Sequence, residues 1–400
     1  MKEMKPFERV WTTLNHEEPD RVPIYEGSIE PHDLTQGQPA LYFQPGILHY
    51  STDILSILTK RWSIPGRKIA FKVLNFPQII LPFIKPGFMM ASKWHRNFGI
   101  DLMGFAGGFP MNLSEKVFKD YKVKDRTVFH RNGEVVTKIS DNFGAVSRFG
   151  FLKSPEDYYR CMEFNPDHPA NYILVRKGLE AAKGKIALYF TVYGAAYFET
   201  LCDMFGFKTL FRLLHRNKSF IKKVVKDLSD FAVAQVEHLA ARGVKLFYMS
   251  SDLGGNTRLM LSPRMWRDFF QAGVTRFCRK VHSYGGKVIM HSCGNSLDLI
   301  DTLITCGIDA LHPWQPYANM DIFQGKQKWG DKLTLIGNVS IELLSQEGKT
   351  HEVVEYVKKL MKEVKPGGGY ILSSSHSLVP TVKWKNAVAM WWAAKKYGKY

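Results

Sequence analysis

The chain has few cysteines and no long hydrophobic run. Its five cysteines are scattered through 400 residues and are odd in number, which argues against a disulfide framework and favours a reducing compartment. No segment reaches the roughly 18 uninterrupted apolar residues that a membrane helix needs. The N-terminal residues 1–9 lack the apolar core of a secretion signal. We therefore expect a cytoplasmic protein that does not span or attach to a membrane.

Motifs for phosphate binding and for nucleic acid are also missing. The sequence contains no GxGxxG or Walker pattern, no zinc-finger spacing and no arginine-rich tail. Its 55 basic and 37 acidic residues give a net charge of +18, but the basic residues occur all along the chain. Charge spread in this way indicates a solvated positive surface that attracts an anionic substrate or an acidic protein. We expect no nucleic-acid partner.

Strand-like and helix-like segments alternate in the second half of the chain. The strands predicted there are 244–252, 287–293, 309–314, 333–338 and 369–374, and helices are predicted over 263–284, 297–305, 320–329, 351–364 and 383–396. Earlier strands at 21–26, 100–105 and 185–192 complete a count of eight. Parallel strands with helical crossovers form either a closed barrel or an open doubly wound sheet.

Polar residues at the predicted strand ends favour the barrel. They are Glu26, Asp252, His291, Cys293, Gln315, Asn338 and His376. A (β/α)8 TIM barrel places its active site at this end of its strands, whereas an open sheet more often carries a glycine-rich phosphate loop. We expect residues 1–400 to form a single barrel domain, with a helical insertion at 28–97 near the mouth and a hairpin at 135–148.

Several of these residues are candidates for the pocket. We expect Asp252, Asn256, Gln315 and Asn338 to line it, because each ends or follows a strand on the active face. Asp252 is the first candidate for a proton donor or orienting carboxylate, and Glu26 is the second. An aspartate paired with a neighbouring arginine is the ordinary alternative. Among the aromatic residues, Tyr193 and Trp314 could hold an aromatic ring, with a place in the core as their alternative.

The segment His291-Ser-Cys293 indicates a metal site. Residues two apart in a strand face the same side, so the imidazole and the thiol converge. Histidine and cysteine together suit zinc, although such a pair also occurs among ordinary core residues. His376, after the eighth strand, is the candidate third ligand, and His312 is one of the histidines that compete with it.

Taken together, the motifs resemble a known family. The segments that carry the resemblance are Phe7-Glu-Arg-Val10, Leu14–Pro23, Asp252-Leu-Gly-Gly255, Leu261-Ser-Pro263, His291-Ser-Cys-Gly-Asn295 and Gly367–Leu372. They are similar to the uroporphyrinogen decarboxylase superfamily, and within it to the corrinoid-dependent methyltransferase branch, from about residue 6 to residue 398. The resemblance implies a (β/α)8 barrel, in agreement with the strand count.

Two departures from the family pattern bear on function. True uroporphyrinogen decarboxylases carry Arg-Gln-Ala-Gly-Arg after the first strand to hold substrate carboxylates, whereas residues 25–31 here are acidic. Thiol-methylating members such as methylcobamide:coenzyme M methyltransferase hold zinc through a His-x-Cys pair and a distant cysteine, and His376 stands at that cysteine position. Zinc held by one thiolate and two imidazoles keeps a formal charge of +1, which makes it a stronger Lewis acid.

The resemblance therefore implies a zinc-dependent methyltransferase. Its methyl donor would be a small methoxylated compound, plausibly aromatic, and its acceptor the Co(I) of a corrinoid (cobalamin). The chain has no recognisable corrinoid-binding domain, so we expect a separate corrinoid protein to carry this cofactor. The alternatives are methyl transfer from methylcobamide to a thiol, a non-catalytic corrinoid- or tetrapyrrole-binding barrel, and a decarboxylase of a non-porphyrin acid.

Overall fold

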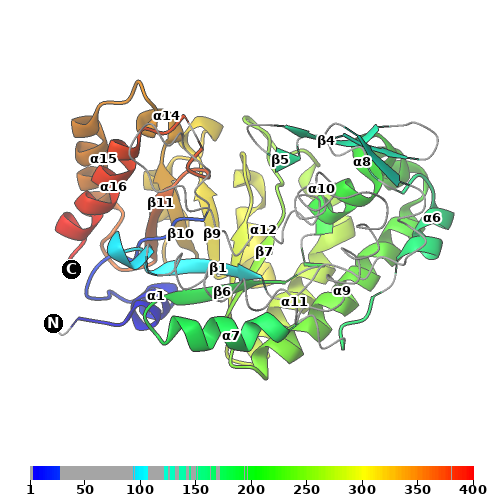
Figure 1. The fold of residues 1–400 in the computed structure, drawn as a ribbon, viewed down its shortest axis with the longest axis horizontal. Coiled ribbons are helices and arrows are strands. Elements are labelled where there is room, and N and C mark those ends of the chain that lie inside the picture. Colours follow the sequence, from blue (N-terminus) through cyan, green and yellow to red (C-terminus); the bar gives the residue numbers. More distant parts are fainter. Residues whose placement is uncertain are drawn as a thin grey trace.

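The computed structural model describes most of the second half of the chain and parts of the first. The described residues are 3–27, 93, 95–106, 121–124, 127–130, 135–140, 144–145, 150, 152–162, 164–167, 172–192, 194–195 and 197–400 except 380. The predicted insertion at 28–97 falls almost wholly outside these ranges and stays a prediction, as does the pocket role of Tyr193. The two ends of the chain lie on the same side of the molecule (Figure 1).

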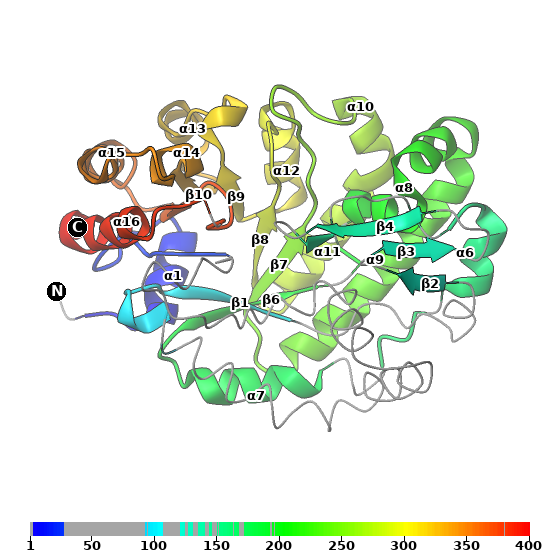
Figure 2. The ribbon, with the colours of Figure 1, turned by 45° about the horizontal axis from the view of Figure 1, so that its top comes forward.

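A parallel sheet forms the centre of the described structure. Seven strands follow one another in chain order: β1 (Leu102–Ala106), β6 (Ala187–Thr191), β7 (Leu246–Ser250), β8 (Lys287–His291), β9 (Ala310–Trp314), β10 (Thr334–Val339) and β11 (Tyr370–Ser374). The sheet is curled, and helices lie along its outer side (Figure 2). A doubly wound sheet would reverse its strand order at a switch point. Since the order here never reverses, that alternative is wrong for the described strands.

The segment at residues 23–25 lies between the first and last strands of the sheet. The amide of Tyr25 donates to the carbonyl of Leu372 at 2.9 Å, and the amide of Leu372 donates to that of Pro23 at 3.0 Å. On the other side, the Asp101 amide donates to the Ile24 carbonyl at 2.8 Å. The predicted strand 21–26 is thus present as single parallel bridges to β11 and β1.

Helices follow the strands as the sequence predicts. Their bounds are α1 (Pro6–Leu14), α6 (Pro155–Cys161), α7 (Ile173–Ala182), α8 (Tyr197–Arg216), α9 (Lys218–Ala240), α10 (Pro263–Trp266), α11 (Ala272–Ser283), α12 (Ile300–Cys306), α13 (Ile322–Trp329), α14 (Ile341–Leu344), α15 (Thr350–Glu363) and α16 (Trp384–Tyr397). A π-helical turn at residues 267–271 joins α10 to α11. At the start of α10 the Ser262 hydroxyl accepts a hydrogen bond from the Met265 amide and so caps the helix before Pro263.

Two hydrophobic layers hold the strands. The inner one lies within the curl of the sheet and includes Leu102, Ala187, Leu246, Ile289, Ile336 and Ile371. Val10 and Leu14 of α1 pack into this layer, and the Thr334 hydroxyl at the start of β10 donates to the Thr13 carbonyl at 3.4 Å. Helix α1 therefore closes the N-terminal end of the strands, which leaves their C-terminal end for a site.

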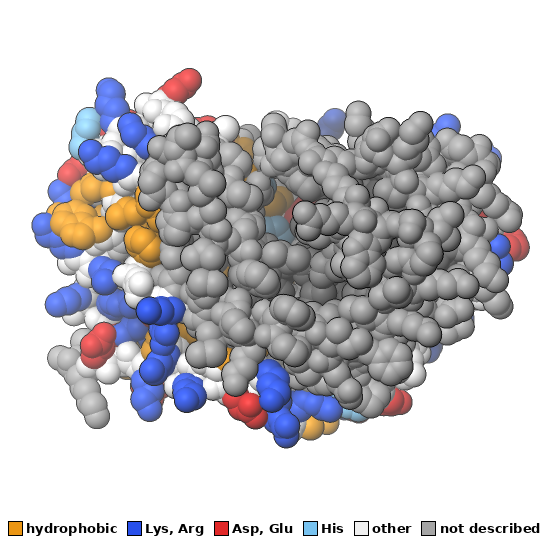
Figure 3. Space-filling model, viewed as in Figure 1, with side chains coloured by type: hydrophobic (Ala, Val, Ile, Leu, Met, Phe, Trp, Pro, Cys, Tyr) orange, Lys and Arg blue, Asp and Glu red, His pale blue; other side chains and the backbone are white. Residues whose placement is uncertain are grey.

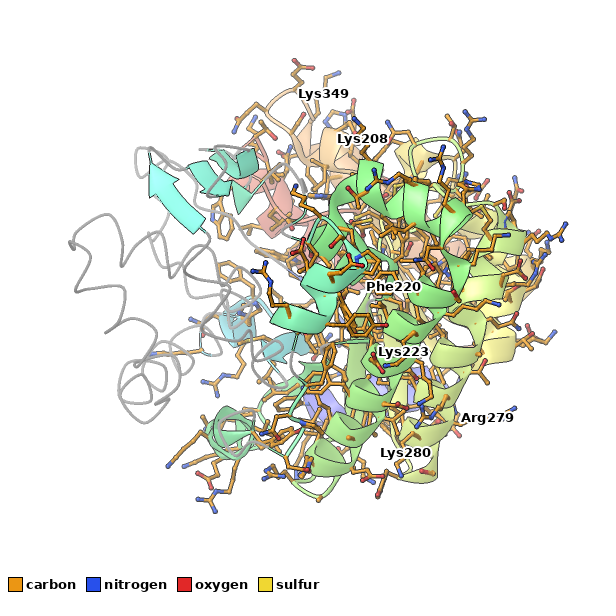
Figure 4. All side chains as sticks on the ribbon, turned by 90° about the vertical axis from the view of Figure 1, so that its right-hand side faces the viewer. Lys208, Phe220, Lys223, Arg279, Lys280 and Lys349 are labelled. Atoms are coloured by element: carbon orange, nitrogen blue, oxygen red, sulfur yellow. The ribbon has the colours of Figure 1, made fainter. Side chains whose placement is uncertain are left out.

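The outer layer lies between the sheet and the helices. At the start of α9, Phe220 is buried and packs edge-on against Tyr158, while Lys223 and Arg279 extend from α9 and α11 toward solvent (Figure 4). This alternation buries one face of each helix and leaves the other to water. Among the described residues, no helix is both long enough and apolar enough to cross a membrane.

The predicted hairpin is part of a small antiparallel sheet. Strands β2 (Tyr121–Lys124), β3 (Thr127–His130), β4 (Val135–Ser140) and β5 (Gly144–Ala145) pair in chain order. In both ribbon views this sheet lies beside α6 and α8 (Figures 1 and 2). The hairpin prediction at 135–148 is confirmed by the pairing of β4 with β5.

Candidate metal centre

Three possible metal ligands meet where β7 and β8 end. His291 is the last residue of β8 and stands in register with Ser250 of β7 and His312 of β9. Cys293 follows two residues later, and Asp252 lies two residues past the end of β7. One ligand atom from each of Asp252, His291 and Cys293 lies within 4.8 Å of the other two. The predicted convergence of the imidazole and the thiol is therefore present, and a carboxylate joins them.

The distances in this trio fit a tetrahedral zinc ion. His291 Nε2 lies 3.3 Å from Cys293 Sγ and 3.3 Å from Asp252 Oδ1. Zinc bonds of about 2.3 Å to sulfur and about 2.0–2.2 Å to nitrogen or oxygen separate tetrahedral ligand atoms by roughly 3.4–3.6 Å. These two spacings are therefore within a few tenths of an ångström of those that zinc requires, and the Cys293 and Asp252 ligand atoms lie no more than 4.8 Å apart.

A cysteine–histidine–aspartate catalytic triad fits the same residues less well. In such a triad, the nucleophile and the carboxylate contact opposite nitrogens of the imidazole. Here the Cys293 thiol and the Asp252 carboxylate both approach Nε2 of His291. Three ligand atoms that face one point suit a shared cation. Burial alone would lower the pKa of His291, but the charges of Cys293 and Asp252 outweigh it and raise this pKa well above its usual range.

Two glycines let the loops that carry these ligands cross closely. A Cβ on Gly254 would lie 2.4 Å from the amide nitrogen of Asn295, and a Cβ on Gly294 would lie 2.2 Å from the carbonyl oxygen of Gly254. Gly294 also has a φ of +79°, which favours glycine. The Gly254 amide donates to the Cys293 carbonyl at 3.2 Å, and the Cys293 amide donates to Asp252 at 3.0 Å. The glycines of both sequence motifs thus hold Asp252 and Cys293 together.

Gln315 holds this site together from the loop after β9. Its Oε1 accepts a hydrogen bond from the Gly294 amide, and its Nε2 donates to the Ser375 carbonyl at 3.0 Å and to the Tyr317 hydroxyl at 2.6 Å. The side chain is buried. Gln315 therefore lies beside the trio, and its amide is already used in joining the loops after β8, β9 and β11.

Asn338 and Trp314 were predicted to line the pocket, and both have partners in the helical layer. Asn338 Nδ2 donates to the Trp314 carbonyl at 3.0 Å, and its Oδ1 accepts from the Tyr356 hydroxyl of α15 at 2.5 Å. Trp314 is fully buried against Gly325 and Trp329 of α13. Both side chains thus support the wall of the sheet.

A bulge in β9 explains the direction of Trp314. Between Leu335 and Gly337 of β10 the chain advances two residues, whereas β9 advances three, from Leu311 to Trp314. One extra residue reverses the alternation of faces. His312, two residues after the inward-facing Ala310 and in register with His291, faces the interior of the curl, where its ring meets the Tyr25 ring edge-on at 4.9 Å between centroids. The bulge turns Trp314 outward instead.

Two further predicted residues, Asn256 and His376, do not belong to the trio. Asn256 is exposed in the loop after β7. His376 is half-buried and its Nδ1 lies 3.4 Å from the Ser377 carbonyl. Burial, and then the charge of His291, lower the pKa of His376. His376 is not in the group of ligand atoms within 4.8 Å.

Glu26 is buried between β11 and α16 and is not in the group of ligand atoms within 4.8 Å. Its carboxyl accepts a hydrogen bond from Ser374 at the end of β11 and lies against Trp391 of α16. Burial raises its pKa to about 8, against the opposing effect of these two neighbours. This environment makes Glu26 a neutral acid at pH 7 within the wall of the sheet.

Sequence reasoning did not select three residues that surround the trio. His312 lies within hydrogen-bonding distance of His291, and the Tyr248 ring centroid lies 6.2 Å from that of His291. Tyr317 receives a hydrogen bond from Gln315, and burial, with a further contribution from the charge of Cys293, raises its pKa to about 12. His312 was considered as a competing histidine, and its place on the inner face follows from its regular register with His291.

Comparisons with known proteins agree with the motifs. The sequence pattern of the family described as "Uroporphyrinogen decarboxylase (URO-D)" matches residues 152–397. A solved methyltransferase from Methanosarcina mazei shares 14% identity over 99% of both chains, with a TM-score of 0.60. A D-psicose 3-epimerase from Clostridium cellulolyticum H10 shares 10% identity over 78% of this chain and 92% of its own, with a TM-score of 0.41. No curated protein matches the sequence.

The matched range contains β6 to β11 and every member of the metal trio. It is also more than half of the 400 residues. The chain therefore belongs to the uroporphyrinogen decarboxylase family.

Proposed function

We propose that this protein is a zinc-dependent methyltransferase that moves a methyl group from a small methoxylated compound, preferably aromatic, to the Co(I) of a corrinoid on a separate protein. We further propose that the segment at 21–26 is the first strand of a complete (β/α)8 barrel, because residues 23–25 bond to both β1 and β11. The observation that carries the function is the convergence of Asp252, His291 and Cys293 at the C-terminal end of the strands.

The zinc would be held by His291 Nε2, Cys293 Sγ and a carboxylate oxygen of Asp252, with His376 as a fourth ligand that the substrate oxygen would join or replace, because a catalytic zinc site needs a position for its substrate. Zinc bound there acts as a Lewis acid that polarises an ether oxygen. If Asp252 binds, the formal charge of the site falls from the expected +1 to zero. A carboxylate oxygen is still a harder donor than a second thiolate. This set of ligands therefore favours cleavage of a bond at a substrate oxygen over presentation of a thiolate nucleophile.

In the proposed reaction the bond between the methyl carbon and the ether oxygen breaks with both electrons left on oxygen. The methyl group passes to Co(I), and the leaving oxygen takes up a proton. Asp252, which we expected as the proton donor, is occupied as an acceptor by His291 and by the Cys293 amide. Tyr317 suits the role better, because its hydroxyl accepts from Gln315 and keeps its own hydrogen for a ligand.

A corrinoid protein would dock over the C-terminal end of the strands, where the trio lies. On the face seen in Figure 3, lysine and arginine side chains are more frequent than acidic ones among the described residues at its left and lower edges. The net charge of +18 would steer an acidic partner toward the protein. Since such steering is screened over about 8 Å at physiological ionic strength, the association rate should fall as salt rises.

The test combines metal analysis with a paired assay. The purified protein is supplied with a Co(I) corrinoid protein and aryl methyl ethers in one series, and with methylcobamide and thiols in the other. We expect demethylation only in the first series, and its loss in Cys293→Ala but not in Cys278→Ala, a matched change at a buried cysteine on α11. Methylation of thiols alone would reverse the proposed direction, and methyl release without any corrinoid would refute the acceptor.

A further inference from the structure

We propose that His312 is a positioning residue for the metal centre, which fixes the hydrogen of His291 on Nδ1 and thereby presents Nε2 to the metal. This inference rests on the proposed zinc site and adds a residue that neither the motif nor the set of ligand atoms contains. It is carried by the contact between the two histidines, whose Nδ1 atoms lie 2.9 Å apart.

The contact permits only one arrangement when the metal is bound. Two nitrogens at hydrogen-bond distance share one hydrogen, so one Nδ1 donates and the other accepts. A neutral imidazole that binds a metal through Nε2 carries its hydrogen on Nδ1. His291 Nε2 is the atom that faces Cys293 and Asp252. His291 Nδ1 therefore donates, and His312 Nδ1 accepts.

The surroundings of His312 hold its ring in the accepting position. His312 is 5% exposed and lies on the inner face of β9. Its ring meets the edge of the Tyr25 ring, and Tyr25 in turn shares a hydrogen bond of 2.7 Å with the Tyr189 hydroxyl. Tyr189 stacks on Tyr248 with 4.3 Å between centroids. A ring packed in this way has little freedom to rotate, so its nitrogen stays aimed at His291.

An imidazole acceptor also differs chemically from the usual partner of a metal-bound histidine. Most such histidines donate to a carboxylate, a backbone carbonyl or water. Neutral His312 orients the ligand as those groups do, but it adds no negative charge to the site. The metal consequently keeps more of its positive charge than it would beside a carboxylate, which agrees with chemistry at an oxygen atom.

The test measures metal binding by the whole protein with Zn²⁺ or Co²⁺ alone, without methyl donor or corrinoid. His312→Leu removes the acceptor and His312→Asn retains one near the position of Nδ1. We expect His312→Leu to lose about 10–100-fold in zinc affinity in chelator competition, and His312→Asn to recover most of it. The Co²⁺ form should keep its thiolate absorption, because Cys293 stays, while its ligand-field bands shift in His312→Leu. His282→Leu, at a histidine paired with Asp309 on the surface of α11, is the matched control.

The inference would be overturned if His312→Leu bound zinc as tightly as the wild type and its Co²⁺ form had an unchanged spectrum. If that variant fails to fold, nitrogen-15 spectra of histidines in the zinc-loaded wild type decide: a protonated Nδ1 and a metal-bound Nε2 on His291 support it, and the reverse tautomer refutes it. Wild-type protein that binds no zinc would instead refute the proposed function. Zinc binding without methyl transfer would leave the role of His312 in place.

Discussion

Glu26 offers a test of the packing between β11 and α16. Its side chain is 1% exposed, and burial raises its pKa from 4.5 to about 8. Between these two pH values the unfolded chain has released a proton that the folded protein retains. The unfolded state therefore binds fewer protons, and the free energy of unfolding falls as pH rises. Stability from the neutral carboxyl is full below pH 4.5 and is lost progressively up to about pH 8.

The magnitude follows from the size of the pKa shift. Each pH unit within this window changes the free energy of unfolding by about 1.4 kcal/mol, so Glu26 lowers it by about 3 kcal/mol between pH 5 and pH 7. Glu26→Gln keeps the shape of the side chain and removes the titration. We expect this variant to be about 3 kcal/mol more stable than the wild type at pH 7, and to differ much less at pH 5.

Urea unfolding at pH 5, 6, 7 and 8 measures this difference directly. Other groups titrate in both proteins, and subtraction of the two curves cancels their contribution. Glu347→Gln, at an exposed side chain, controls for the loss of one carboxylate. Parallel stability curves for the wild type and Glu26→Gln would show that Glu26 ionises normally in the folded protein, and the reasoning about its burial would be wrong.

Three further changes test other parts of the structure. Gly325→Ala should lower the free energy of unfolding by about 1–3 kcal/mol, because its Cβ would lie 2.4 Å from the buried Trp314 ring; a more stable variant in urea would contradict this packing. Arg9→Leu should lower the free energy of unfolding by about 3 kcal/mol, because Arg9 and Asp101 form a buried ion pair at 2.6 Å that Arg21 only partly replaces. An unchanged urea midpoint would show that this ion pair makes no net contribution to stability. Tyr317→Phe should retain full zinc content while the methyl-transfer rate falls about 10²-fold or more, and a wild-type rate would remove Tyr317 as the proton donor.

The sequence predicted the order of the strands and the polar residues at their ends, because hydrophobic runs and helix caps are local signals. His291 and Cys293 converge as a two-residue spacing in a strand requires. The place of Trp314 depends on a bulge in β9, and no local pattern marks it. Asn338 ends its strand as predicted, yet the Tyr356 hydroxyl from α15 uses its side chain, a contact between segments that spacing along the chain does not encode.

The role of Asp252 likewise depends on contacts that spacing along the chain does not encode. Its position after β7 was correct, but its partners come from the next loop, which the close approach of Gly254 and Gly294 brings beside it. Only the folded chain shows that its carboxylate and the Cys293 thiol approach the same nitrogen of His291. That geometry favours Asp252 as a ligand of the proposed zinc over Asp252 as a proton donor.

Metal content measured together with zinc-edge X-ray absorption on the purified protein tests the metal centre. We predict one zinc per chain, with one sulfur ligand at about 2.3 Å and nitrogen or oxygen ligands at about 2.0–2.2 Å. Cys293→Ala should lose the sulfur ligand and most of the zinc, whereas Cys306→Ala, at a buried cysteine on α12, should retain both. A wild-type protein without zinc, or Cys293→Ala with a full complement of it, would contradict the assignment of Asp252, His291 and Cys293 as the metal centre.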